Sequence, residues 1–245
     1  GTIQSSQADY FQATRAPGHG DGHLIVLAPS GIQEAVDLVA DAFDLADKYL
    51  NPAMILADGM IGQMMEPIVW KERKAAELPP KNWAALGREA PGKTHFVTSL
   101  RLQSTENELF NRELVGKYQR IAQEETRWEE IDCQDADIII VAYGTTSRIC
   151  LSAARKLRQE GIKAGLFRPI TLWPYPYDAL KKTAGQKSVK AVLTVEMSSG
   201  QMVEDVRLAI CGLKPTPFYG RTGGMIPETD QVADRIRQVL QEVKA

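Results

Sequence analysis

The most constraining feature of the sequence is an amphipathic helical pattern between two short, wholly apolar runs. The runs cover residues 24–28 and 53–57, and both have the length of buried strands. A strand–helix–strand unit of this kind implies parallel strands joined by a right-handed crossover. Ser30 and Gln33 have the spacing of a capping box at the start of the helix. The spacing predicts one buried helix face, formed by Ile32, Val36, Val39, Phe43, Ala46 and Leu50.

This unit is too small to be a domain. Roughly 65 residues with two central-type strands leave both edges of the sheet unpaired, whereas continuous apolar strands normally have neighbours and helices on both faces. We therefore expect residues 1–66 to be the C-terminal half of a larger α/β domain. Its other strands either precede Gly1 in the full-length protein or belong to another chain.

A second α/β region is expected over residues 135–245. Strand-like runs alternate there with helical patterns, and Gly161 has the position of a helix C-cap. The alternation predicts a doubly wound, mostly parallel sheet. Residues 67–134 are rich in proline and charge, and we interpret them as a surface linker followed by a long charged helix over 104–130, interrupted near Gly116. The strands are expected at 137–143, 162–167, 189–195 and 217–219.

Composition excludes several classes of protein. Lys and Arg number 29 against 31 Asp and Glu, for a net charge of -2, so nothing favours nucleic acid or an anionic membrane as a partner. No apolar run approaches the roughly 20 residues of a membrane span, and the first residues do not resemble a signal peptide. The three cysteines (133, 150 and 211) are too far apart for a disulfide framework or a cluster motif. We expect a cytoplasmic protein that supplies no iron–sulfur ligands itself.

Loops that follow the expected strands are the candidate contact sites, because open parallel sheets bind ligands at the carboxyl ends of their strands. Glycines and hydroxyls at a helix start expose backbone N–H groups that bind anions. The competing interpretation, which we favour, is that these loops are caps and turns at a partner interface. Arg168 and Glu196 either bind a ligand or pair with one another. The candidate residues are Gly144, Thr145, Arg168, Glu196 and Arg221.

The run from His19 to His23 invites a metal-site interpretation, but His95 is the one other histidine in the chain. Gly20-Asp21-Gly22 followed by Asn51 also has the spelling of a thiamine diphosphate motif. Both parts precede their strands, at the amino edge of the sheet, whereas the motif requires them after strands. No metal site is therefore predicted in this chain.

Longer segments resemble the α subunits of 2-oxoacid:ferredoxin oxidoreductases. The general family resemblance lies in GTIQSSQADYFQAT (1–14), GHGD (18–21) and LAPS (27–30). The branched-chain (2-oxoisovalerate) type is resembled most closely by ADGMIGQMMEP (57–67), GLFRPITLWP (165–174) and FYGRTGGMIP (218–227). The resemblance covers nearly the whole chain and matches the C-terminal two-thirds of such subunits.

The resemblance implies an enzyme that decarboxylates a 2-oxoacid with thiamine diphosphate, passes electrons through iron–sulfur clusters to ferredoxin, and forms acyl-CoA. This chain would supply half of a pyrimidine-type domain and a transketolase-C-terminal-like domain. A β subunit would hold the diphosphate and Mg²⁺, and a small ferredoxin-like subunit would carry the clusters. An α–α contact in a larger oligomer is also implied.

The family's catalytic Glu, which contacts the aminopyrimidine, belongs to the part that precedes Gly1, and Glu34 does not match its position. We therefore expect the isolated chain to be inactive and assign no catalytic residue. By resemblance, Thr2, Gln4, His19 and Asp21 border the active site, and Gly20 is a cofactor-contact candidate. A loop-ordering hydrogen-bond network is the alternative role for these residues.

Two rival functions stay open at this point. The chain is alternatively a non-catalytic dimerisation or docking module, with aromatic loops such as residues 172–175 at an interface. A free-standing nucleotide- or coenzyme A-binding domain is a third possibility, but the sequence lacks a GxGxxG or P-loop motif.

Overall fold

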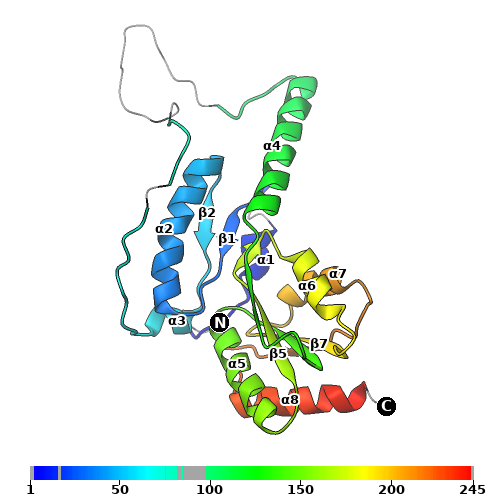
Figure 1. The fold of residues 1–245 in the computed structure, drawn as a ribbon. Coiled ribbons are helices and arrows are strands. Elements are labelled where there is room, and N and C mark those ends of the chain that lie inside the picture. The colour runs from blue at the N-terminus through cyan, green and yellow to red at the C-terminus, as the bar shows by residue number, and fades with distance from the viewer. Residues whose placement is uncertain (1–2, 16–17, 75, 82–83, 85–97, 244–245) are drawn as a thin grey trace, which may run out of the picture.

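A computed structural model describes residues 3–15, 18–74, 76–81, 84 and 98–243. Within these residues the chain forms a three-stranded sheet, in the order β2-β1-β6, and a five-stranded sheet, in the order β3-β5-β4-β7-β8 (Figure 1). The strands are β1 (Ile25–Leu27), β2 (Ala53–Ile55), β3 (Trp128–Ile131), β4 (Ile138–Val141), β5 (Ala164–Pro169), β6 (Thr171–Trp173), β7 (Ala191–Glu196) and β8 (Phe218–Gly220). The helices are α1 (Tyr10–Thr14), α2 (Ile32–Tyr49), α3 (Gly59–Gln63), α4 (Ser104–Glu124), α5 (Gly144–Gln159), α6 (Tyr177–Ala184), α7 (Met202–Ile210) and α8 (Thr229–Glu242).

The small sheet joins the two halves of the sequence. β1 and β2 are parallel neighbours, as predicted. The other edge of β1 is not bare, because β6 pairs with it antiparallel, with Val26 opposite Trp173. The sequence analysis was wrong here, since it assigned residues 171–173 to a loop. In the described part of the chain, β2 has a neighbour on one side only.

Helix α2 packs on this sheet through a different face from the one predicted. Leu38, Leu45 and Tyr49 are buried against β1 and the Ile121 side chain of α4. Half of the predicted face is in solvent, because Phe43 is 72% exposed and Val39 and Leu50 are 44% and 57% exposed. Ile32, Val36 and Ala46 of that face are half-buried. Both stripes have helical spacing, so the pattern alone does not choose between them. The strands beneath the helix decide which stripe is buried.

The expected capping box at the start of α2 is also wrong. The helix begins at Ile32, and the backbone N–H and the hydroxyl of Ser30 both donate to the carboxylate of Glu34, at 2.7 and 2.9 Å. Gln33 instead exchanges hydrogen bonds with the backbone of Val69. Glu34 therefore makes the reciprocal contact with Ser30 that the sequence analysis assigned to Gln33.

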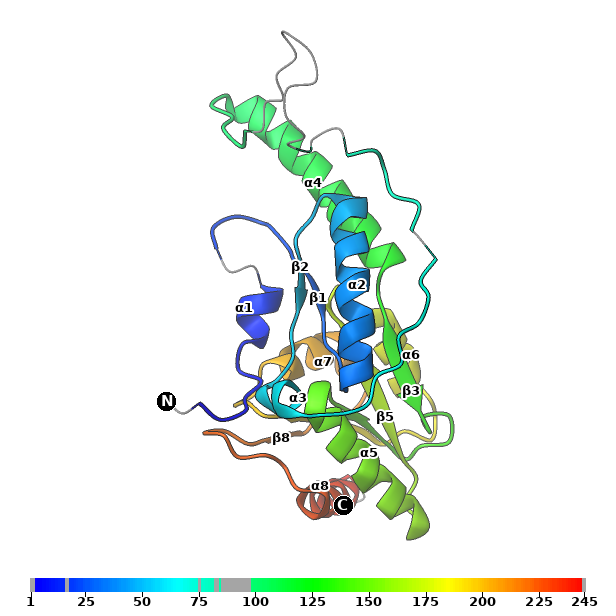
Figure 2. The ribbon, with the colours of Figure 1, turned by 90° about the vertical axis from the view of Figure 1, so that its left-hand side faces the viewer.

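The start of the linker lies along the acidic side of α2 (Figure 2). Lys71 bonds to Asp37 at 3.0 Å, and Arg73 reaches Asp41 and Asp44 at 2.9 and 2.7 Å. This agrees with the expected surface path, whereas most of residues 82–97 lies outside the described part. Exposed ion pairs of this kind contribute little individually, so the contact fixes a path more than it stabilises the fold.

Helix α4 runs without interruption through Gly116 and extends away from both sheets (Figures 1 and 2). It ends earlier than predicted, because residues 128–131 form β3, antiparallel to β5, with Glu129 opposite Arg168. The charged sequence WEEI has no apolar alternation that would mark a strand, and pairing with β5 decides its conformation.

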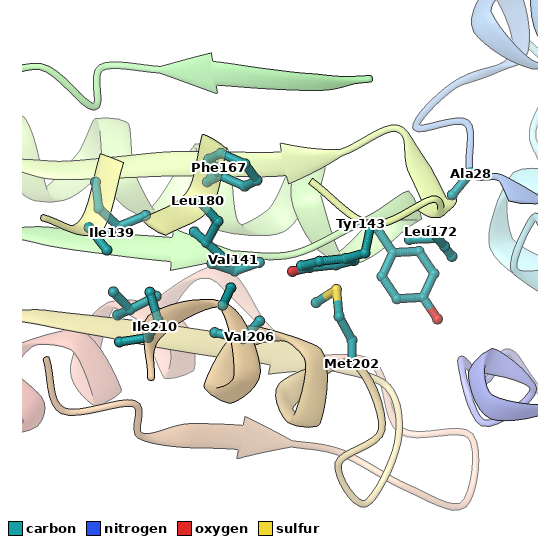
Figure 3. Close-up of a cluster of buried hydrophobic side chains, with 14 of the residues drawn as sticks. Ala28, Ile139, Val141, Tyr143, Phe167, Leu172, Leu180, Met202, Val206 and Ile210 are labelled. Carbon is teal, nitrogen blue, oxygen red and sulfur yellow. The ribbon is translucent and has the colours of Figure 1, made fainter. Parts of the chain in front are cut away.

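The large sheet is the expected doubly wound core. Strands β5, β4, β7 and β8 are parallel neighbours, and only β3 is antiparallel. Helices α6 and α7 contact one another over one face and α5 and α8 over the other. Figure 3 shows Val141 of the sheet beside Val206 of α7, with Phe167 next to Leu180 of α6. Among the described helices, none has the length and apolarity needed to cross a membrane.

Candidate site at the carboxyl edge of the large sheet

The N-terminal segment closes over the carboxyl ends of β4 and β7 through Gln7. Its amide nitrogen donates to the Tyr143 carbonyl at 2.9 Å, and its amide oxygen accepts from the Met197 N–H at 3.0 Å and the Thr146 hydroxyl at 2.8 Å. The Gln7 backbone N–H donates to the Met197 carbonyl at 2.8 Å. One buried side chain from the first unit thus occupies the edge where open parallel sheets usually hold ligands.

Asp58 makes the second closure. It follows β2 and caps α3, where its Oδ1 accepts from the N–H groups of Met60 and Ile61. The same carboxylate accepts from the N–H and hydroxyl of Thr145, at 2.8 and 2.6 Å. Because the first N–H groups of a helix lack intrahelical partners, one buried carboxylate satisfies donors at the start of both α3 and α5.

A glycine at position 144 is required by this contact. Gly144 has φ +57°, and a Cβ there would stand 2.6 Å from Asp58 Oδ2. The neighbouring Tyr143 ring is buried, and burial, with Glu196 and Asp58 nearby, raises the pKa of its hydroxyl well above the usual value. Tyr143 therefore stays protonated and donates to the Gln7 carbonyl at 3.3 Å. Gly144 and Thr145 thus contact the other half of the chain.

Glu196 and Arg168 do not pair with each other. Glu196 is fully buried, and its carboxylate caps α7 by accepting from the N–H groups of Gln201, Met202 and Val203. The same carboxylate accepts from the Ser198 hydroxyl. Arg168 is 6% exposed and forms a two-bond contact with Glu34 of α2, at 2.9 and 3.0 Å. Its Nε donates to Glu129 at 2.8 Å. Within the described chain both side chains bind protein groups, which favours the structural role over the ligand role.

Arg221 lies beside the same loop. Its backbone N–H donates to the Glu196 carbonyl at 3.1 Å, and its guanidinium reaches Gln231 of α8 at 3.1 Å. The hollow that remains between Gln7, Asp58 and Tyr143 has a volume of about 20 Å³, which is water-sized. The structure therefore brings Gly144 and Thr145 to a sealed junction with Asp58. Glu196 caps α7 beside this junction, Arg168 joins β5 to α2, and Arg221 lies next to the Glu196 loop.

The described residues do not form a site for Mg²⁺ and a diphosphate. Asp58 and Glu196, the buried carboxylates at this edge, both accept several protein hydrogen bonds. No group of three or more His, Cys, Asp or Glu with metal-binding geometry occurs among the residues that the structure describes. Asn51 uses its amide nitrogen to bond the carbonyls of His23 and Pro52, so it orders the loop before β1.

The candidates taken from the family resemblance do not lie together. Thr2 is outside the described residues, and Gln4 lies in the exposed segment just before Ser5, which contacts Gly59 after β2. His19, Gly20 and Asp21 lie in the loop before β1, at the opposite edge of the small sheet. All three of these loop residues are exposed.

Sequence reasoning missed Gln7 and Asp58, which make the closure. Asp58 had a usable signal, because an Asp directly after a strand and before Gly59 is a typical helix N-cap. Gln7 gave none, since a single Gln in an aperiodic segment is not distinctive.

Family models match both halves of the chain. The thiamine diphosphate-binding domain of pyruvate flavodoxin/ferredoxin oxidoreductases matches residues 1–125, and core domain II of pyruvate:ferredoxin oxidoreductase matches residues 136–232. The chain belongs to the 2-oxoacid:ferredoxin oxidoreductase family. Curated relatives at 43% and 44% identity support this assignment. The predicted role, a subunit of an oxidoreductase that acts within a complex, is confirmed.

Three relatives show how the similarity is distributed. The ketoisovalerate oxidoreductase subunit VorB of Methanothermobacter marburgensis is 43% identical over 99% of this chain and 68% of its own length. VorB of Methanothermobacter thermautotrophicus is 44% identical over 98% of this chain and 67% of its own length. The 2-oxoglutarate synthase subunit KorA of M. marburgensis is 30% identical over 95% of this chain and 68% of its length. The similarity is therefore higher to the ketoisovalerate type.

A solved structure confirms the fold. The 2-oxoglutarate:ferredoxin oxidoreductase of Magnetococcus marinus, determined with 2-oxoglutarate, coenzyme A and succinyl-CoA bound, superposes with a TM-score of 0.77 at 21% identity. The match covers 96% of this chain and 45% of that chain. The predicted fold class, part of a pyrimidine-type domain followed by a doubly wound domain, is confirmed.

Proposed function

We propose that this chain is the α-type subunit of a branched-chain 2-oxoacid:ferredoxin oxidoreductase that uses 2-oxoisovalerate and forms the corresponding acyl-CoA. The 43% identity to a ketoisovalerate oxidoreductase subunit over nearly the whole chain carries this proposal. The identity to a 2-oxoglutarate synthase subunit over a similar span is lower, at 30%, which supports 2-oxoisovalerate over 2-oxoglutarate as the substrate. The cytoplasm is the location we propose, because Cys133, Cys150 and the exposed Cys211 are all free thiols.

Thiamine diphosphate supplies an electron sink for decarboxylation when it is bound. The described carboxylates at the sealed junction already accept hydrogen bonds from protein groups, so we assign the diphosphate and its Mg²⁺ to a β subunit. The clusters are assigned to a small ferredoxin-like subunit that passes electrons to ferredoxin. The residues of this chain hold its two halves in one fixed arrangement through Gln7, Asp58 and Arg168. We expect no turnover from the chain alone.

An open flank on the small sheet supports the proposal that the chain represents the C-terminal two-thirds of the subunit. β2 is the outer strand in the described part, and the exposed Val39, Phe43 and Leu50 of α2 form one stripe. An unpaired strand edge beside an uncovered apolar helix stripe normally has further elements packed on it. We assign this flank to the remaining strands of the pyrimidine-type domain, supplied by the same subunit or another chain.

The alternative of a docking module without catalysis is weakened by the junction. Gly144, Thr145 and Glu196 contact residues of their own chain, so these loops are not free to receive a separate partner. The α–α contact in a larger oligomer stays a prediction.

The test is anaerobic co-expression of the tagged chain in its source cells, followed by identification of the proteins and cofactors that co-purify. We expect a β subunit with thiamine diphosphate, a cluster-bearing subunit, and ferredoxin reduction that requires coenzyme A. Rates with 2-oxoisovalerate should exceed those with 2-oxoglutarate. Recovery of the chain alone, or faster turnover of 2-oxoglutarate, would contradict the proposal.

The open flank has its own matched test. Phe43→Arg places a charge on the exposed stripe, and Arg235→Asp changes charge on the distant helix α8. We expect the first variant to lose co-purifying partners and the second to keep them. Equal recovery of partners by the two variants would show that the stripe is not covered in the assembly.

A further inference from the structure

A hollow of about 420 Å³ lies beside β6, at the edge of the small sheet opposite the open β2 flank. Its volume falls within the range of small-molecule sites. The end of α4, the edge strand β3 and the segment from β6 into α6 form its wall. The lining residues are Ala122, Gln123, Thr126, Trp128 and residues 173–179. Because the strands assigned to the other flank pack on β2, we do not expect them to fill this hollow.

Aromatic side chains make up much of the wall. They are Trp128, Trp173, Tyr175 and Tyr177. Trp173 is half-buried and stacks on His23, with ring centroids 4.5 Å apart and ring planes at 7° to each other. Trp128 is 42% exposed, and its indole N–H donates to Glu130 at 3.1 Å. Both indoles are thus held in place while part of their surface stays open, which lowers the cost of ordering them when a ligand binds.

The charge around this aromatic wall is negative. Asp178 is the one charged residue among those that line the hollow. It lies exposed in the first turn of α6, and its carboxylate makes no hydrogen bond or ion pair with the described residues. Glu130 accepts from the Trp128 indole and from the Thr183 hydroxyl, and no described cation pairs with it. Two carboxylates without counterions therefore lie at the aromatic wall.

The cations that are nearest in sequence do not neutralise these carboxylates. Arg127 precedes Trp128 but pairs with Asp41 of α2 at 2.6 Å. The lysines at 181–182 lie one turn further along α6, and neither forms an ion pair with Asp178 within the described chain. The hollow is therefore aromatic and acidic, a combination that disfavours an anionic ligand and favours a cationic one.

We propose that this hollow binds a small organic ammonium ion of the alkylated or quaternary type. Its cationic head contacts the Trp128 and Tyr177 rings and faces the Asp178 carboxylate, and its alkyl groups lie against the apolar part of the wall. Aromatic faces attract cations, with Trp the strongest, and alkylated ammonium ions combine a charge with an apolar surface. The site needs neither the partner subunits nor the reaction proposed above.

The test is a titration of the full chain with choline, followed through the ¹H–¹⁵N signals of the indole N–H groups. The chain has four tryptophans, so these signals are few, and Trp128→Phe identifies the signal of Trp128. We expect a saturable shift of that signal. The neutral isostere 3,3-dimethylbutan-1-ol should bind at least about fivefold more weakly than choline, because it has no charge to interact with the rings. Asp178→Asn should weaken choline binding about threefold, as expected for an exposed ion pair.

Glu204→Gln is the matched control, because Glu204 is also an exposed acid in the first turn of a helix, α7. Its affinity for choline should equal that of the unmodified chain. An unmoved Trp128 signal, equal binding of the neutral alcohol, or equal affinities of the Asp178→Asn and Glu204→Gln variants would overturn the proposal. Tighter binding of a lysine-containing peptide than of choline would assign the hollow to a protein partner and would overturn it as well. If a variant fails to melt cooperatively, the comparison of choline with the alcohol on the unmodified chain still decides.

Discussion

Replacing Asp58 with alanine is the most direct test of the junction between the two halves. The substitution removes four accepted hydrogen bonds, two from α3 and two from Thr145 at the start of α5. It leaves the Thr145 N–H buried without a partner, because that residue is 4% exposed. The perturbation is therefore larger than the loss of an ordinary exposed cap.

The expected loss of stability combines the effect at the start of α3 with the effect at Thr145, at the start of α5. Loss of an N-cap at α3 costs about 1 kcal/mol. The bonds to Thr145 are shorter, at 2.8 and 2.6 Å, and involve a charged acceptor. Each such bond is worth about 1.5–3 kcal/mol, but the contributions are not independent. We expect a total loss of about 3–4 kcal/mol in the free energy of unfolding.

Urea denaturation followed by tryptophan fluorescence measures this loss, and hydrogen exchange shows where it occurs. Exchange should speed up at the Thr145 amide and stay slow at the Val203 amide, which Glu196 caps independently. Asp234→Ala is the control, since Asp234 pairs with Arg237 in an exposed contact and its loss should cost less than about 0.5 kcal/mol. A loss from Asp58→Ala no greater than that of the control would refute this account of the junction.

Three further outcomes are expected. Glu196→Gln should lower the free energy of unfolding, measured by urea denaturation, by about 2–4 kcal/mol. The Glu196 carboxylate accepts from three backbone N–H groups at the start of α7, and the NH₂ group of a Gln side chain would face these donors without being able to accept from them. Phe43→Ser should cost less than about 0.5 kcal/mol and Leu45→Ala about 2–4 kcal/mol, and the reverse order in thermal unfolding would show that α2 is turned the other way. Burial lowers the folded-state pKa of His23, so the unfolded chain binds the proton more readily, and stability should fall as pH drops below about 6.5. His23→Phe should reduce that slope between pH 7 and 5, and an unchanged slope would contradict the assignment.

Much of the large sheet was predictable because its strands are buried on both faces. The runs that became β4, β5 and β7 are mostly apolar, and the runs of β4 and β7 are each followed by a patterned helix. A strand that is buried on both faces carries apolar side chains at successive positions, so it is recognisable in the sequence as a continuous apolar run. The parallel order then followed from the rule for crossover connections.

Elements that depend on distant pairing could not be predicted. β6 has three residues in a proline-aromatic loop, and its partner Val26 is far away in sequence. The strand β3 is charged and exposed, and its conformation is decided by β5. Helix α2 offered two apolar stripes, and only the position of the strands beneath it selects Leu38 and Leu45.

Sequence reasoning placed the loop candidates in the fold but did not find the residues that they contact. Topology placed Gly144, Thr145 and Glu196 at one sheet edge, where the structure finds them. The partner of Thr145 was beyond sequence reasoning, because Asp58 comes from the other half of the chain, as does Gln7, which bonds Thr146.

The exchange of β6 into the small sheet has a consequence for the order of synthesis. β1 emerges from the ribosome early, but the strand that covers one of its edges is made only after α5 and β5. Contacts so distant in sequence form slowly, and an apolar strand with a bare edge is prone to association while it waits. The nascent first half therefore needs protection until residues 171–173 have been translated, and a gene cut at the linker would yield an N-terminal piece that lacks part of its own sheet.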